Sequence, residues 1–197
     1  MGKFRRVFGI VLILIGVGII ANVAYKKIVT SHKQNELLEA FESQIADAKN
    51  EETSEPVSLE AINGYTPVAI MEIPSIKLKQ PVVDGITEDV IKYFLGRFPD
   101  SAMPGEVGNF AVAGHRVSDF TDAFINLYKV KVGDEVRVIT RQKEHIYRVN
   151  SIEKIAPTRI DVLNEDKSKQ EITLITCSDM SRTRICVKGT LISSNDI

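Results

Sequence analysis

Three side chains that together can perform acyl transfer on a thiol lie at the ends of predicted strands. Cys177 ends the apolar, β-branched run 173–177, and Arg184 follows seven positions later, at the start of the next such run. His115 closely follows an earlier apolar run, residues 110–113. A thiolate is a strong nucleophile, a histidine exchanges protons near neutral pH, and a guanidinium stabilises an oxyanion. These residue types predict a cysteine transpeptidase rather than a binding module.

Each of these residues also has a purely structural interpretation. A lone cysteine is commonly a buried structural thiol, although the polar neighbours Thr176 and Ser178 argue against deep burial of this strand end. Taken alone, His115 is better explained as a histidine whose hydrogen bonds are satisfied in the core or at the surface. His32, in the N-terminal region, and His145, inside an alternating strand, receive no role.

Two arginines are candidates for the oxyanion-stabilising role, and the favoured one also has two alternative ion-pair partners. Arg184 supplies a permanently charged fork of donors, and opposite Cys177 in a hairpin it would reach a developing oxyanion. Its alternative role is a surface ion pair with Asp179 or Glu171. Arg182 lies nearer the turn, where solvation is stronger, and is the less favoured candidate.

Short β-rich runs separated by turn residues predict the fold of residues 63–197. Many short strands with few helices indicate a mainly β fold, a closed or nearly closed antiparallel barrel. Two helical segments are expected, at 88–95 and about 119–128. The predicted strands are 67–73, 77–83, 108–113, 135–140, 145–155, 160–163, 171–177 and 184–191.

An apolar N-terminal segment predicts a membrane anchor. Residues 7–24 form a run of apolar residues and glycine broken only by Asn22, which is about the length that spans a bilayer as a helix. The basic residues of segment 1–6 favour a cytoplasmic N-terminus, with the rest of the chain outside the cell. A cleaved signal peptide is the alternative, but the run is long and lacks a clean cleavage site.

Residues 25–62 are predicted to be an extracellular stalk and linker. Apolar residues from Leu37 to Ala48 recur at helical spacing, and residues 50–58 become acidic and break at Pro56. The favoured interpretation is a solvated spacer. The alternative is an appendage whose apolar stripe docks on the catalytic domain or covers its cleft.

The net charge and the cysteine content argue against nucleic-acid binding and against a structural metal site. The chain has 197 residues and a net charge of −1, so it has no general affinity for nucleic acid. It has two cysteines and no cysteine–histidine cluster with zinc spacing, so a structural metal is not expected.

Together the motifs resemble the sortase family. Residues 173–177, Thr-Leu-Ile-Thr-Cys, match the family's T-L-x-T-C signature, and Ala113-Gly114-His115 matches its histidine motif about 60 residues earlier. Arg184 precedes an apolar strand, as the family arginine does. Further agreement comes from segments 73–76, 81–85 and 124–134, and the resemblance covers about residues 66–191 plus the anchor.

The resemblance implies an eight-stranded sortase-type β-barrel and a specific reaction. Sortases cut an L-P-x-T-G-like sorting signal of a secreted protein between Thr and Gly. By this resemblance, Cys177 attacks the Thr carbonyl and forms a thioacyl intermediate, His115 acts as general acid and base, and Arg184 stabilises the oxyanion or positions the peptide. An amine, often from a peptidoglycan precursor of the lipid II type, then resolves the intermediate.

The resemblance also bears on subclass and cofactors. The N-terminal anchor and the short hairpin resemble class A or class D, with class D favoured. Some class A members bind calcium through acids in a region like that of Asp161, Glu165 and Asp166, but a solvated acidic loop explains these three better, so no cofactor is expected. In the surrounding loop, Ile160, Val162 and Leu163 either contact the substrate or pack in the core.

Alternatives from other classes stay open at this point. One is another cell-wall cysteine enzyme, such as an L,D-transpeptidase, although Thr176-Cys177 departs from its glycine–cysteine signature. Another is a membrane-tethered β-barrel adaptor without catalysis. Cys186 is expected to be a free structural thiol, and a Cys177–Cys186 disulfide would disarm the proposed nucleophile.

Overall fold

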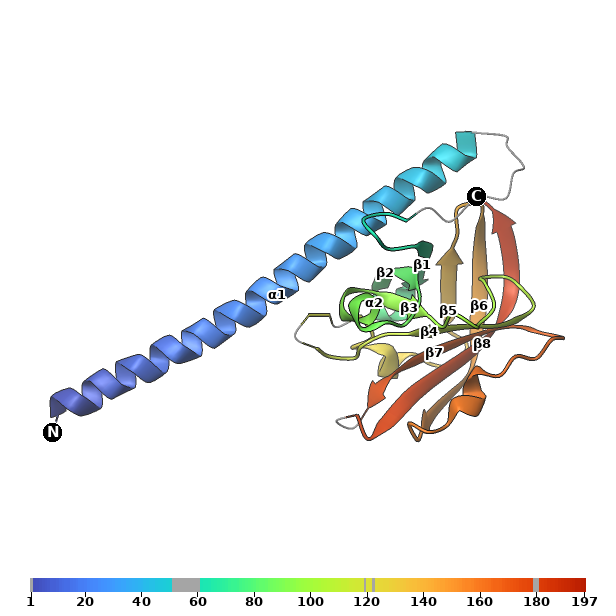
Figure 1. Ribbon diagram of the computed structural model, residues 1–197. Helices are drawn as coiled ribbons and strands as arrows, with labels where there is room; N and C mark the ends of the chain where they lie inside the picture. Colours follow the sequence, from blue (N-terminus) through green and yellow to red (C-terminus); the bar gives the residue numbers. More distant parts are fainter. Residues whose placement is uncertain (1, 51–60, 119, 122, 179–180) are drawn as a thin grey trace.

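A long N-terminal helix and a closed β-barrel make up the protein (Figure 1). The computed structural model describes residues 2–50, 61–118, 120–121, 123–178 and 181–197. Helix α1 (Gly2–Asn50) extends along one side of the barrel, and its N-terminal half projects beyond it. The predicted fold class, an eight-stranded barrel with short helices after an N-terminal apolar helix, is confirmed.

The barrel contains both antiparallel and parallel pairs. Its neighbour order is β1-β2-β3-β4-β7-β8-β6-β5, closed by the pairing of β5 with β1. The pairs β2–β3 and β4–β7 are parallel, and the others are antiparallel. The strands are β1 (Pro67–Ile73), β2 (Leu78–Asp84), β3 (Leu95–Arg97), β4 (Gly108–Ala113), β5 (Glu135–Ile139), β6 (Lys143–Ile155), β7 (Gln170–Ser178) and β8 (Thr183–Asp196).

Most predicted strands are present, but the short elements differ from expectation. The prediction of a strand over 160–163 is wrong, since Ile160–Leu163 forms the 3-10 helix η3. Strand β3 was not expected, because three residues are too few to show an alternating pattern. The predicted helix 88–95 is α2 (Glu88–Tyr93), capped by the Thr87 hydroxyl, and ends before β3 begins.

The segment expected to form a second helix mostly does not. Residues 119 and 122 lie outside the description, and the described residues from 120 to 126 form bends and turns. Only the 3-10 helix η2 (Leu127–Lys129) follows them, and a third 3-10 helix, η1 (Pro74–Ile76), joins β1 to β2. The predicted linker 50–58 lies almost entirely outside the described residues.

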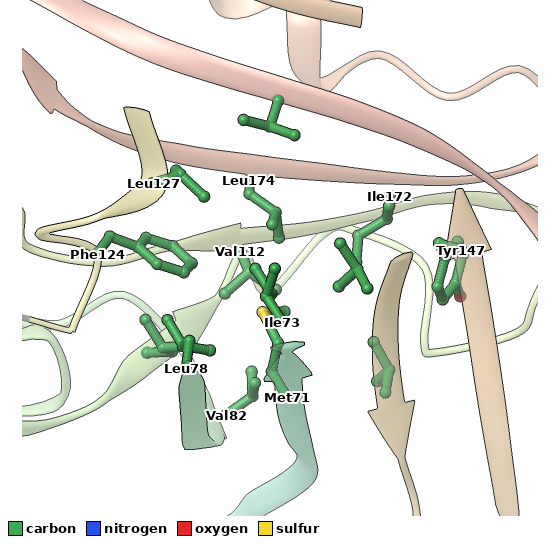
Figure 2. Close-up of a cluster of buried hydrophobic side chains, with 14 of the residues drawn as sticks. Met71, Ile73, Leu78, Val82, Val112, Phe124, Leu127, Tyr147, Ile172 and Leu174 are labelled. Atoms are coloured by element: carbon green, nitrogen blue, oxygen red, sulfur yellow. The ribbon is translucent and has the colours of Figure 1, made fainter. Parts of the chain in front are cut away.

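Alternation along each strand separates the barrel interior from its outer face. Ile172 and Leu174 of β7 point into the main core, together with Val112 of β4 (Figure 2). Phe110 of β4 belongs to the same core. The alternate residues of β7, whose side chains point away from the barrel interior, form the outer face. There Ile155, Val162 and Cys186 make a smaller buried cluster against which Ile175 packs, so η3 covers the outer face of β7 and β8.

Helix α1 docks on the barrel through its apolar stripe. Leu37 and Phe41 are 2% and 0% exposed, and Leu37 packs in a cluster with Val83 and Phe94. The Arg141 guanidinium donates to Gln44 at 2.6 Å and lies over the Phe41 ring. The expected helical spacing is therefore confirmed, but the favoured interpretation of a solvated spacer is wrong for this stripe.

The N-terminal half of α1 has the composition of a membrane span. Within the described residues, one helix, covering Phe4–Asp47, is long and apolar enough to cross a bilayer. Its side chains from Val7 to Ile20 are largely exposed. An apolar surface of that length on a projecting helix requires a lipid environment or a partner, and this supports a membrane anchor.

Candidate functional site

Two of the three predicted site residues lie on adjacent strands, and the third follows the end of a neighbouring strand. Cys177 of β7 is the register partner of Arg184 on the antiparallel strand β8. Because partners on neighbouring strands share a face at about 5 Å spacing, Cys177 and Arg184 lie side by side. On the other side, β4 runs parallel to β7, with Ala113 opposite Ile175, and His115 lies two residues beyond the end of β4.

Two hydrogen bonds hold the histidine turn against β7. The Gly114 N–H donates to the Ile175 carbonyl at 3.1 Å, and the Thr176 hydroxyl donates to the Gly114 carbonyl at 2.8 Å. Gly114 has room only for hydrogen, because a Cβ there would overlap the side chains of Leu95 and Phe124. Thr176, 2% exposed, points inward and thereby fixes the residue that precedes His115.

A buried amide ties the η3 loop to the same strands. Asn109 of β4, 0% exposed, donates to the Val162 carbonyl at 3.2 Å and accepts from the Thr173 hydroxyl at 2.8 Å. Both bonds are buried. The two threonines of the 173–177 motif therefore have structural roles: Thr173 helps to hold the loop over the outer face, and Thr176 holds the histidine turn.

Burial sets the electrostatics of His115. The side chain is partly buried, and desolvation lowers its pKa below the ordinary value of 6.5. A neutral imidazole is thus the dominant form at pH 7, which leaves a ring nitrogen able to accept a proton. Its backbone carbonyl accepts from the Phe124 N–H at 2.9 Å, which closes the loop after β4.

Cys177 opens into a cavity of about 530 Å³. The thiol is partly exposed, as a nucleophile must be. The Arg116 guanidinium lies 5.1 Å from the ring centroid of Tyr128, and both line the cavity. Neither Arg116 nor Tyr128 is expected in the site from the sequence. The only sequence signal for this part of the cavity is the cluster of apolar and aromatic residues that follows β4. The other described lining residues are Val117, Ile125, Asn126, Ser178 and Ser181.

The Arg184 guanidinium caps the turn between β7 and β8. Its Nη1 donates to the carbonyls of Ser181 at 2.9 Å and Thr183 at 3.1 Å. Glu171 lies at the other end of β7, opposite Thr190, so the alternative pairing of Arg184 with Glu171 is wrong. The other alternative partner, Asp179, lies outside the described residues, and Arg182 is exposed.

Cys186 lies on the same outer face but not beside the candidate nucleophile. Its register partner is Ile175, and this pair is two pairs away from that of Cys177 and Arg184. Both thiols are free in the structure. Cys186 is 3% exposed, and burial raises its pKa to about 11, so it is protonated at neutral pH.

The acids of the η3 loop are engaged with cations. Asp161 accepts two hydrogen bonds from Arg159, at 2.6 and 2.8 Å, and Asp166 pairs with Lys169 at 2.8 Å. In the part of the chain that the structure describes, no three His, Cys, Asp or Glu side chains gather as metal ligands would.

Comparison with known proteins assigns the class of enzyme. The model of the Sortase domain family matches residues 71–192, the segment that contains His115, Cys177 and Arg184. The chain belongs to the sortase family, whose members are cysteine transpeptidases that act in anchoring proteins to the cell wall.

Individual relatives cover most of the chain. Sortase A of Bacillus anthracis is 27% identical over 205 residues, which is 96% of this chain and 97% of that protein. The structure of a Clostridium perfringens Sortase D5 transpeptidase is 31% identical, with a TM-score of 0.66, and covers 86% of this chain and 99% of that one. Sortase D of Bacillus subtilis is 27% identical over 112 residues, covering 57% of this chain and 54% of that protein. The expectation that class D is favoured is consistent with these similarities.

Proposed function

We propose that the protein is a membrane-anchored transpeptidase that cleaves an L-P-x-T-G-like sorting signal between Thr and Gly. Three features support the proposal: the pairing of Cys177 with Arg184 across β7 and β8, the hydrogen bonds that hold the turn before His115 against β7, and the cavity into which the thiol opens. Residues 63–197 are the catalytic domain, 25–62 the stalk and linker, and 7–24 the anchor, with residues 1–6 in the cytoplasm.

The first half of the reaction makes a thioester. The Cys177 sulfur attacks the Thr carbonyl carbon, and its proton passes to His115. The oxyanion that forms needs donors, and we assign this role to the guanidinium of Arg184, whose residue is the register partner of Cys177. When the intermediate collapses, the Thr–Gly bond breaks and His115 protonates the departing amine. The acyl group remains on sulfur.

The second half transfers the protein to an amine. An amine nucleophile, here proposed to belong to a peptidoglycan precursor of the lipid II type, loses a proton to His115 as it attacks the thioester. The new amide bond forms and the Cys177 thiol is released, so the net reaction exchanges one amine for another. A histidine that is neutral at rest suits this use, because it begins each half-reaction as a base.

The η3 loop over the outer face presents one exposed apolar side chain, which we assign to contact with the signal peptide. Ile160 of η3 is 75% exposed, whereas Val162 is 5% exposed and packs against Ile155 and Cys186. The two interpretations of this loop, core packing and substrate contact, therefore apply to different residues. Val162 packs in the smaller buried cluster on the outer face, and Ile160 is available to contact the apolar residues of the substrate.

A fluorogenic L-P-x-T-G peptide tests the proposal. The full-length enzyme should cleave it, and Cys177→Ala should abolish turnover, whereas the matched variant Cys186→Ala should retain it. Arg184→Lys keeps the charge but loses the planar fork, so we expect a loss of at least tenfold in kcat. Equal signals from the enzyme and Cys177→Ala would favour a non-catalytic adaptor.

A further inference from the structure

The cavity that contains Cys177 lies at the end of β7. Ser178 and Ser181, which follow the thiol in the chain, line one part of it, and the loop after β4 supplies the rest of the described lining. By contrast, η3 packs over the pair formed by Ile175 and Cys186, which precedes Cys177 along β7. Along the direction of β7, η3 therefore lies before the thiol, and the cavity extends beyond it.

Arg116 supplies the charge of this cavity. It directly follows His115 in the chain, and it is the only permanently charged side chain among the lining residues that the structure describes. Its guanidinium lies 5.1 Å from the ring centroid of Tyr128, a contact between a cation and an aromatic face. Within the described part of the chain, Arg116 pairs with no carboxylate and donates to no acceptor. Its N–H donors therefore remain available to a ligand in the cavity.

The chemistry of the lining indicates the class of ligand. Three of the lining residues, Val117, Ile125 and Tyr128, are 65%, 40% and 51% exposed, and they give the cavity apolar and aromatic surface. A partly buried guanidinium binds a carboxylate well, because two parallel N–H···O bonds form with its planar fork. The cavity therefore fits a compact ligand that carries one carboxylate beside uncharged atoms.

The order of the proposed reaction indicates which ligand this is. The acyl part of the sorting signal stays on the Cys177 sulfur while one amine departs and another enters, so both amines use the same side of the thioester. The apolar residues of the signal are assigned to Ile160 of η3, which lies before the thiol along β7. The cavity beyond the thiol is then the space left for the amines.

We propose that this cavity is the acceptor site and that Arg116 selects an amine that carries a free carboxylate. The inference rests on the proposed function and adds the chemical class of the acceptor to it. The carboxylate takes no part in bond formation, since its oxygens only accept hydrogen bonds from the guanidinium. The amine nitrogen attacks the thioester carbon and loses a proton to His115, the amide bond forms, and the C–S bond breaks to release the Cys177 thiol.

A competition between two acceptors tests the proposal. The full-length enzyme in neutral detergent micelles receives an L-P-x-T-G peptide and equal concentrations of glycylglycine, which has a free carboxylate, and glycylglycinamide, which has none. Liquid chromatography separates the two transfer products, and their ratio is measured. Because the ratio depends only on steps that follow thioester formation, a change in the rate of the first half-reaction does not alter it.

Charge variants at position 116 define the expected result. We expect the ratio of glycylglycine product to glycylglycinamide product to be about fivefold higher for the enzyme than for Arg116→Gln. Arg116→Lys should keep part of this preference, and Arg116→Glu should lower the ratio below that of Arg116→Gln. Lys129→Gln is the matched control, because Lys129 lies 5.5 Å from the ring centroid of Tyr128 but does not line the cavity. It should leave the ratio unchanged.

Other outcomes would overturn the proposal. An equal ratio for the enzyme and Arg116→Gln would show that the guanidinium does not select the acceptor, and an equal fall in Lys129→Gln would show a general effect of surface charge. If Arg116→Gln instead lost a preference for peptides with an acidic residue x, the guanidinium would contact the acyl side.

A reaction without acceptor separates this inference from the proposed function. Release of the Gly-containing fragment from the peptide reports thioester formation followed by hydrolysis. No release would refute the proposed function and the acceptor site together. Release by the enzyme, combined with equal use of the two acceptors by the enzyme and Arg116→Gln, would refute the acceptor site alone.

Discussion

Replacing Thr176 by valine tests how the barrel positions His115. The Thr176 hydroxyl donates to the Gly114 carbonyl at 2.8 Å inside the protein, and Gly114 directly precedes the histidine. Valine has nearly the same shape, so the change removes the hydrogen bond without opening a cavity. Removing one partner of a buried hydrogen bond costs about 1–3 kcal/mol, which for a domain of this size lowers the melting temperature by about 3–12 °C.

The same change should reduce turnover by more than the loss of stability explains. Without the bond, the His115 turn is free to shift relative to β7, and a misplacement of about 1 Å can cost on the order of 100-fold in rate. We expect kcat for sorting-signal peptide to fall about tenfold or more, measured at a temperature where Thr176→Val is fully folded. Thermal unfolding by circular dichroism provides that temperature.

Thr190→Val is the matched control. Thr190 also lies in the sheet and makes a side-chain hydrogen bond, but that bond, with Asn150, is exposed. Its loss should change stability by less than about 0.5 kcal/mol and leave kcat unchanged. If Thr176→Val resembled Thr190→Val in both melting temperature and kcat, the argument that this bond positions the histidine would be refuted.

Three further predictions concern protonation, thiol reactivity and the stalk. Because burial lowers the pKa of His115 below 6.5, the unfolded chain binds its proton first as pH falls, so the unfolding free energy should decline below about pH 6.5. His115→Gln should reduce the dependence of the unfolding free energy on pH, measured by urea titrations at several pH values. An unchanged pH dependence would contradict burial as the cause of the lowered pKa of His115. Since Cys186 is buried with a pKa of about 11, iodoacetamide at pH 8 should alkylate Cys177 at least tenfold faster, as peptide mapping would show, and equal rates would contradict its burial. Phe41→Ala should weaken docking of α1 by about 3–5 kcal/mol, so hydrogen exchange should accelerate in residues 34–45 with little change inside the barrel. Unchanged exchange there would support the spacer interpretation.

The sequence was most informative where a local pattern coincides with a local structure. The alternating run 171–177 predicts a strand, and β7 follows it closely, because a strand with one face in the core needs that alternation. By contrast, the run 160–163 is too short for its period to distinguish strand from helix. In the fold, η3 buries Val162 and packs Leu163 against the same cluster, while Ile160 stays exposed.

Contacts between segments that lie far apart in the chain could not be predicted from the sequence. The parallel pairing of β4 with β7 brings the strand that precedes His115 alongside the strand that ends with Cys177 and Ser178, yet nothing local to either segment specifies that pairing. The apolar stripe of α1 is equally compatible with several partners, and only the fold shows that Leu37 packs on the barrel. Asn109 gave one usable signal, because a polar residue within an apolar strand implies a buried hydrogen bond.

The central claim is that Cys177 carries the acyl group of a cleaved sorting signal. The most direct measurement is the intact mass of the full-length protein after incubation with an L-P-x-T-G peptide and rapid acid quenching. The account predicts one adduct with the mass of the peptide through its Thr, mapped to Cys177, absent from Cys177→Ala and discharged by an added amine. An adduct on Cys186, or peptide cleavage by Cys177→Ala at the normal rate, would contradict it.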